Sequence, residues 1–204
     1  NYNVVVGDEA GTAITTGDSN VIVGMVAGDA LTTASDNVAI GQGALTADTL
    51  GSKTVAIGRQ ALTTQNFTSA TDTYNTAVGF RAGLSVTTGV QNTLIGGLAG
   101  DAITTASNNT ALGYASLSAN TTGTENTALG MSSAAGNTTG NYNVSLGKGT
   151  LQTNTTGASN TAVGTNSLQN ATTASNNTAV GNSALIANTT GTSNTAVGKS
   201  ALAA

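Results

Sequence analysis

Hydrophobic and polar residues recur along this chain with a fixed period. The clearest marker is a short string of the type Asn-Thr-Ala-Val-Gly, and the glycine that closes it occurs at twelve places. Successive closing glycines, such as Gly7 and Gly24, are 17 positions apart in ten cases, and Gly58 and Gly79 are 21 positions apart. Self-similarity at a fixed spacing indicates a repeat architecture in which each unit stacks on its neighbours.

We number each repeat from the first residue of its string, so that the closing glycine is repeat position 5. Position 1 is asparagine in eleven of the twelve copies, with Thr54 as the exception, and position 4 is always Val, Ile or Leu. Position 6 admits very different residues, such as Asp8 and Phe80, which is typical of a column that faces solvent. We expect the architecture to depend on the asparagines and glycines that recur: Asn20, Gly24, Asn37, Gly41, Asn75, Gly79, Asn92, Gly96, Asn109, Gly113, Asn126, Gly130, Asn160, Gly164, Asn177 and Gly181.

The pattern within each unit predicts an all-β fold. Each unit has two short apolar stretches, at positions 2–4 and 8–9, and Gly, Asn and Thr separate them. Short apolar stretches between turn residues favour β-strands. A unit this small cannot bury its own apolar face, so the units must stack into a solenoid. We therefore predict a single domain over residues 1–204, a parallel β-solenoid of twelve coils with a four-residue insertion within residues 63–74.

Stacking would give a physical role to the recurring positions. Glycine at position 5 indicates a turn that needs positive φ or a close approach of two backbones. Asparagine at position 1 would lie above and below other asparagines, and such stacked amides hydrogen-bond to one another. The paired threonines at positions 13 and 14, for example Thr155 and Thr156, could form a similar ladder.

The strand positions also predict that several chains associate side by side. Successive side chains of a strand point to opposite faces, so positions 2 and 4 share one face and position 3 takes the other. All three positions are mostly apolar or threonine, yet a coil has only one interior. We expect a second chain to cover the other face. The alternative is a single-chain solenoid with a flat exposed face.

Composition excludes several classes of function. The chain has no cysteine and no histidine, so it lacks the residues of a Ser-His-Asp triad, a thiol nucleophile or a Cys/His zinc site. A net charge of -4 with only five lysines and arginines argues against nucleic-acid binding. No apolar run is long enough to span a membrane. We expect no enzyme activity, no cofactor, no metal and no membrane insertion.

The acidic residues are concentrated near the start of the chain. Six of the nine lie between Asp8 and Asp48, and they occupy different repeat positions. Carboxylates bind Ca²⁺ when several of them converge. Because these acids do not recur at one position, we expect them to be solvated surface charges.

The repeated strings resemble those of a known class of fibres. Asn37-Val38-Ala39-Ile40-Gly41 resembles the head repeats of trimeric autotransporter adhesins of the YadA type, and Asn160-Thr161-Ala162-Val163-Gly164 is a close variant. Similar strings occur in bacterial and phage tail-fibre proteins. The resemblance covers all twelve copies. It implies a left-handed β-roll, three identical chains side by side, and an extracellular location on a cell surface or virion fibre.

The resemblance also implies a structural and adhesive role. Such a segment displays a variable outer face for attachment to a host glycan or protein. Since the repeat runs through the chain without an atypical capping unit, we expect a segment of a longer shaft.

The insertion is the strongest candidate for a binding site. A lengthened turn on a regular solenoid projects as a loop, and such loops commonly carry binding residues. Aromatic side chains near an arginine can engage sugars or protein surfaces. The alternative is a tolerated insertion whose aromatics only cover the neighbouring coil. The candidate binding residues in and near the insertion, and further along position 6, are Phe67, Asp72, Tyr74, Phe80, Arg81 and Tyr114.

Two other functions compete with the fibre. An ice- or surface-binding solenoid presents a regular threonine array on a flat face, but the paired threonines here are adjacent and would point to opposite faces. A solenoid polysaccharide lyase or hydrolase needs carboxylates clustered beside a cleft, whereas these acids are scattered. The sequence therefore favours the fibre segment.

Overall fold

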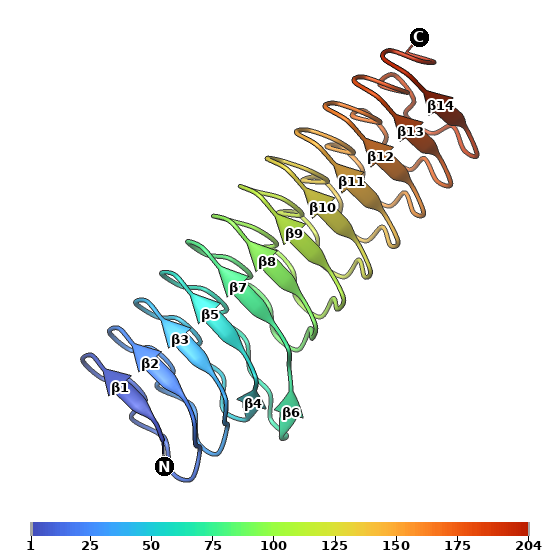
Figure 1. Ribbon diagram of the computed structural model, residues 1–204. Coiled ribbons are helices and arrows are strands. Elements are labelled where there is room, and N and C mark those ends of the chain that lie inside the picture. The colour runs from blue at the N-terminus through green and yellow to red at the C-terminus, as the bar shows by residue number, and fades with distance from the viewer. Residues whose placement is uncertain (1, 204) are drawn as a thin grey trace.

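The computed structural model describes residues 2–203 and shows coils stacked in a row, with the chain ends at opposite ends of the stack (Figure 1). One three-residue strand per coil, at repeat positions 2–4, joins a single twelve-stranded parallel sheet in chain order. The chain is therefore an all-β parallel solenoid with one sequence repeat per turn, as predicted. The sheet consists of β1 (Val4–Val6), β2 (Val21–Val23), β3 (Val38–Ile40), β5 (Val55–Ile57), β7 (Thr76–Val78), β8 (Thr93–Ile95), β9 (Thr110–Leu112), β10 (Thr127–Leu129), β11 (Val144–Leu146), β12 (Thr161–Val163), β13 (Thr178–Val180) and β14 (Thr195–Val197).

The sheet keeps the same register along its whole length. Each strand residue pairs with the residue at the same repeat position in the next coil, as Val38 pairs with Val55. The register continues across the lengthened coil, where Val55 pairs with Thr76. The extra residues are accommodated away from the main sheet, beside a separate pair of short parallel strands, β4 (Gly51–Ser52) and β6 (Thr71–Asp72).

The second predicted strand is absent from the described coils. Positions 8–9 lie in a tight turn, where position 9 takes a positive φ even when it is not glycine, as in Leu45 (φ 54°) and Leu117 (φ 51°). A left-handed residue interrupts the extended backbone that a strand needs. Both leucines are nevertheless fully buried. The apolar pattern at positions 8–9 therefore reports burial correctly, but these residues form a turn and not a strand.

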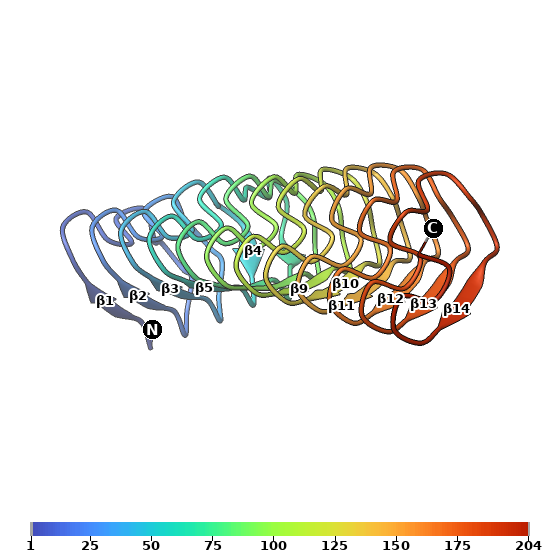
Figure 2. The ribbon, with the colours of Figure 1, turned by 90° about the horizontal axis from the view of Figure 1, so that it is seen from above.

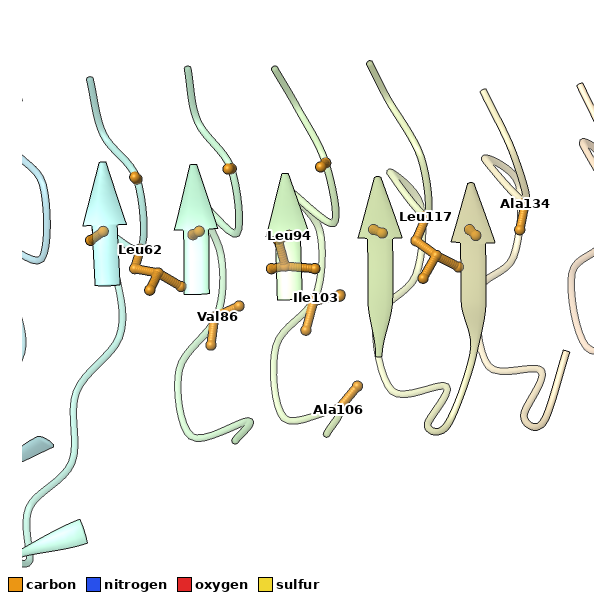
Figure 3. Packing of buried hydrophobic residues seen from close by; sticks show 14 of the residues in the cluster. Leu62, Val86, Leu94, Ile103, Ala106, Leu117 and Ala134 are labelled. Carbon is orange, nitrogen blue, oxygen red and sulfur yellow. The ribbon is translucent and has the colours of Figure 1, made fainter. Parts of the chain in front are cut away.

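The core is a continuous file of side chains inside the coils (Figure 2 shows the stack from above). Position 3 of the strands points inward and is fully buried in most coils, for example at Ala39 and Leu94. Positions 9 and 12 share the same interior space. Figure 3 shows Leu62, Val86 and Ile103 projecting into it from successive coils.

Positions 9 and 12 are complementary in volume. Where position 9 is glycine, position 12 is a large apolar residue, as in Gly100 and Ile103. A Cβ atom added to Gly100 would lie 2.8 Å from Cδ1 of Ile103 and 2.8 Å from Cδ2 of Leu94. Where position 9 is leucine, position 12 is small or polar, as in Leu117 and Asn120. Because interiors are close-packed, each coil has room for one large apolar side chain at position 9 or at position 12, but not at both.

Buried amides at position 1 form a ladder along the stack. In all coils except those next to Thr54, the Oδ1 atom of one asparagine accepts the backbone N–H of the asparagine in the next coil, as between Asn92 and Asn109 (3.0 Å). The Nδ2 group also crosses its own coil to a backbone carbonyl, as from Asn109 to Gly123 (3.0 Å). The amides thus link each coil to its neighbours and close the coil on itself.

A threonine ladder runs parallel to the amides. The Oγ1 of Thr104, at position 13, donates to the backbone carbonyl of Thr121 in the next coil (3.1 Å), and Thr121 repeats the contact with Thr138. Position 14 is different, because Thr105 and Thr122 are exposed. Only the position-13 side chain of each threonine pair therefore belongs to this ladder, although the backbone N–H of Thr139 at position 14 also donates to the carbonyl of Thr155 in the next coil (3.1 Å).

The position-5 glycines combine positive φ with close backbone contact. Their φ angles run from +111° at Gly164 to +140° at Gly79. A Cβ atom on Gly96 would lie 2.6 Å from the carbonyl oxygen of Gly113 in the next coil. No other residue fits this position without moving the neighbouring coil. Within the described residues, no helix is long and apolar enough to cross a membrane.

Candidate functional site

The outward face of the main sheet is a continuous uncharged strip. In the central strands position 3 is buried, whereas positions 2 and 4 stay partly exposed, and Leu112 retains 43% of its surface. In all twelve strands these two outward positions hold only Val, Ile, Leu or Thr. With strands about 4.8 Å apart, the strip covers roughly 500 Å². A single chain therefore buries one face of its strands and leaves the other half-exposed.

The composition of this strip changes along the stack. Position 2 is valine in β1, β2, β3 and β5, and threonine in most strands from β7 onward. Position 4 stays Val, Ile or Leu throughout. The strip is therefore aliphatic before the insertion and presents a threonine file beside an aliphatic file after it.

A buried carboxylate anchors the insertion. Asp48 is fully buried, so the expectation that the early acids are surface charges is wrong for this residue. Its Oδ1 accepts backbone N–H groups of Gly51 (3.0 Å) and Phe67 (3.1 Å), and its Oδ2 accepts the Nε2 group of Gln65 (2.6 Å). These three donors satisfy the carboxylate in the interior. The sequence spacing alone does not predict that they meet Asp48.

Gln65 also provides the side-chain amide that is missing from the asparagine ladder at Thr54. The amide of Gln65 donates to Oγ1 of Thr54 (3.1 Å) and accepts Nδ2 of Asn75 (2.8 Å). The Oγ1 atoms of Thr54 and Thr73 lie 2.6 Å apart. Position 12 thus supplies the amide that position 1 lacks in this coil.

The candidate residues of the insertion have two different environments. Phe67 is only 7% exposed, so it offers little surface to a ligand. Asp72 and Tyr74 are exposed and form a cluster with Lys53. The Lys53 ammonium lies 2.5 Å from Oδ2 of Asp72 and 5.4 Å from the centre of the Tyr74 ring. Lys53 holds the pKa of the Asp72 carboxyl below its usual value, and this carboxylate raises the pKa of Lys53.

Phe80 and Arg81 belong to a second exposed cluster. The guanidinium carbons of Arg59 and Arg81 lie 5.9 Å and 5.3 Å from the centre of the Phe80 ring. Nε of Arg81 donates to Oε1 of Gln60 (3.0 Å). Phe80 keeps 45% of its surface exposed. We call Arg59, Gln60, Phe80 and Arg81 the arginine–phenylalanine cluster.

Tyr114 does not join this cluster. It lies two coils beyond Phe80 in the position-6 column, with Gly97 in the coil between them. A Cβ atom on Gly97 would lie 3.6 Å from Cδ2 of Tyr114, so the tyrosine ring leans over the glycine. Tyr114 is 58% exposed.

Lys53, Arg59 and Gln60 are the members of these two clusters that the sequence alone does not predict. The signal was present in the repeat numbering, because residues at one repeat position become neighbours when coils stack. Lys53 and Tyr74 both end their coils, and Arg59 and Phe80 both occupy position 6. An alignment of consecutive copies therefore predicts that Lys53 lies beside Tyr74 and Arg59 beside Phe80.

The fold and these surfaces define a parallel β-solenoid repeat protein. Comparison with known protein families, with curated proteins and with solved structures finds no match in any of the three. Among the described residues, no group of three or more acidic side chains is placed to hold a metal ion. The interpretation of function therefore depends on the surfaces themselves.

Proposed function

We propose that this chain is a rigid segment of a homotrimeric extracellular fibre that displays binding residues along its outer columns. The observation that carries the proposal is the uncharged outward strip of the main sheet. The largest apolar patch on a protein surface often marks an interaction site, and the aliphatic position-4 residues run along the whole of this strip. A second and third copy would cover the strip, and the variable position-6 column would remain outside.

The resemblance of the repeat strings supports the same assignment. The strings of the YadA type and of tail fibres belong to trimeric fibres, and here such strings form the strands of the sheet. The ladders of amides, threonines and backbone groups stiffen the stack along its axis. Attachment to a glycan or protein on a host surface would then use exposed side chains on the outer columns.

Light scattering after gel filtration tests the assembly. The mass of one chain is 19.7 kDa, and we expect the solution mass to be three times this value. A folded protein with the mass of a single chain would overturn the fibre proposal.

Charged substitutions locate the interface. Leu112→Lys with Leu129→Lys places two charges on the outward strip, and we expect the mass to fall to that of the monomer. Thr122→Lys with Thr139→Lys places the same charges on exposed position 14 of the same two coils and should leave the trimer intact. Equal effects of the two pairs would exclude the strip as the interface.

A specific observation also favours the second candidate, an ice- or surface-binding solenoid. In most strands from β7 onward the strip presents threonine at position 2 and an aliphatic residue at position 4, as in Thr178 and Val180. Both point outward on one parallel sheet, unlike the threonine pairs at positions 13 and 14. If the chain is a monomer, inhibition of ice recrystallisation by the purified protein tests this function, with Thr178→Lys as the disrupting variant.

A further inference from the structure

The arginine–phenylalanine cluster concentrates positive charge on one exposed spot of an acidic protein. The sequence contains only two arginines among its five basic residues, and its net charge is -4. Although Arg59 and Arg81 belong to different repeats, they contact the same ring because their coils are adjacent. The backbone N–H of Arg81 donates to the carbonyl of Arg59 (3.0 Å), which fixes the two residues side by side.

These two guanidinium groups retain free donors. Within residues 2–203 the one ion pair is that of Lys53 with Asp72, so neither arginine has a carboxylate within ion-pair distance. The charge of Arg81 lowers the pKa of the Asp101 carboxyl, but this is the smallest of the influences on that pKa. One nitrogen of Arg81 is engaged by Gln60, and both arginine side chains are exposed to solvent. Two like charges held on one ring repel each other, and a bound anion would relieve that repulsion.

We infer that the arginine–phenylalanine cluster binds an oxyanion of an acidic polysaccharide, a carboxylate or a sulfate. Guanidinium groups match such planar or tetrahedral oxyanions with paired hydrogen bonds. The exposed part of the Phe80 ring offers an apolar surface to the C–H groups of a sugar ring. The cluster lies open on the surface, which suits a long polymer better than a small enclosed ligand. This inference rests on the proposed function and names the ligand class of the outer column.

Binding can be measured by calorimetry with three soluble polymers as probes. Hyaluronate carries carboxylates, dextran sulfate carries sulfates, and dextran is neutral. We expect binding to at least one acidic polymer and none to dextran, with an affinity that falls as salt rises. The acidic polymer that binds identifies the oxyanion. No binding to either acidic polymer would overturn the inference, and so would a preference for anionic lipid vesicles over both polymers.

Matched variants separate a built site from diffuse charge. Arg59→Lys and Arg81→Lys keep the charge but remove the paired donors, and each should weaken binding about tenfold. Phe80→Met should also weaken binding, and methionine already occupies position 6 at Met25 and Met131. Lys148→Gln removes a charge from position 6 of a distant coil and should change the affinity less than about twofold. An equal loss from Lys148→Gln, or no loss from the arginine variants, would overturn the inference.

The mass of each sample distinguishes this inference from the fibre proposal. A trimer that fails to bind acidic polymers overturns the site alone. A monomer that binds through Arg59 and Arg81 overturns the fibre and supports the site. Because all the substituted side chains are exposed, we expect the variants to have the same melting curves as the parent. These curves serve as the control for folding.

Discussion

The side-chain oxygen of Asn92 accepts two hydrogen bonds from Asn109, one from its backbone N–H (3.0 Å) and one from its Nδ2 group (3.3 Å). The two residues are one repeat apart and both are fully buried. The same contact recurs between most neighbouring coils. The ladder therefore requires an asparagine once in every repeat. An asparagine is needed because it supplies a donor and an acceptor on one short side chain.

Removing one amide should therefore destabilise two coil junctions. Asn109→Ala leaves the buried backbone N–H of Asn126 without its partner. It also removes one of the two side-chain donors to the carbonyl of Gly123, which keeps the bond from Asn120. At about 1–3 kcal/mol for a buried group left unsatisfied, we expect a loss of about 2 kcal/mol in denaturant unfolding. Thr122→Ala, on the exposed side of the same coil, should change stability by less than about 0.5 kcal/mol. Equal losses would show that the ladder contributes little.

Two adjacent glycines should respond in opposite directions to alanine. Gly96 has a φ of +128° and no space for a Cβ atom, so Gly96→Ala should cost about 3 kcal/mol. Gly97 lies outside the left-handed region, and its Cβ atom would meet Tyr114 at an ordinary 3.6 Å. Gly97→Ala should stabilise the protein by about 0.4–1 kcal/mol, because it restricts the unfolded chain. Thermal melting of both variants checks the pair, and a tolerated Gly96→Ala contradicts the close-approach argument.

The interior volumes predict a compensating set of substitutions. Gly100→Leu alone overfills its coil and should cost about 1–3 kcal/mol. Adding Leu94→Ala and Ile103→Asn reproduces the interior of the following coil, which holds Ala111, Leu117 and Asn120. We expect the triple variant to recover most of the loss in denaturant unfolding. If it unfolds as easily as Gly100→Leu, the three positions are not coupled through volume.

Asp101 should weaken the fold at neutral pH. Burial raises its pKa, its own backbone N–H and Arg81 offset this in part, and its Oδ1 atom has no partner. A carboxyl whose pKa is raised on folding favours the folded state when protonated, so this stability appears as pH falls and is lost as pH rises through the raised pKa. Asp101→Asn should therefore raise the melting temperature at pH 7.

The pH dependence separates this effect from a new contact. The difference between Asp101→Asn and the parent should shrink below the ordinary aspartate pKa of 3.8, where the carboxyl is protonated in both states. Asp8→Asn, at an exposed position 6, should have no comparable effect at either pH. A constant difference from neutral to acidic pH would point to a cause other than the charge.

The sequence by itself determined the period, the strand at positions 2–4 and the placement of position 3 on the opposite face from positions 2 and 4. These features are local, because alternation within a strand and recurrence from one repeat to the next can be read without knowing any contact. It also located the glycines at position 5, since only one residue type tolerates both their φ and their close approach. Of the candidate binding residues, it identified Phe80 and Arg81 but not their partner Arg59.

Only the tertiary structure decided what depends on contacts between coils. The hydrophobicity of Leu45 and Leu117 is compatible with either a strand or a turn. The path of the coil imposes their left-handed backbone conformation. Asp48 is buried with its charge satisfied, because Gly51 of its own coil and Gln65 and Phe67 of the lengthened next coil donate to it. The sequence lists these residues singly, whereas stacking makes them neighbours, and burial and charge pairing follow from that proximity.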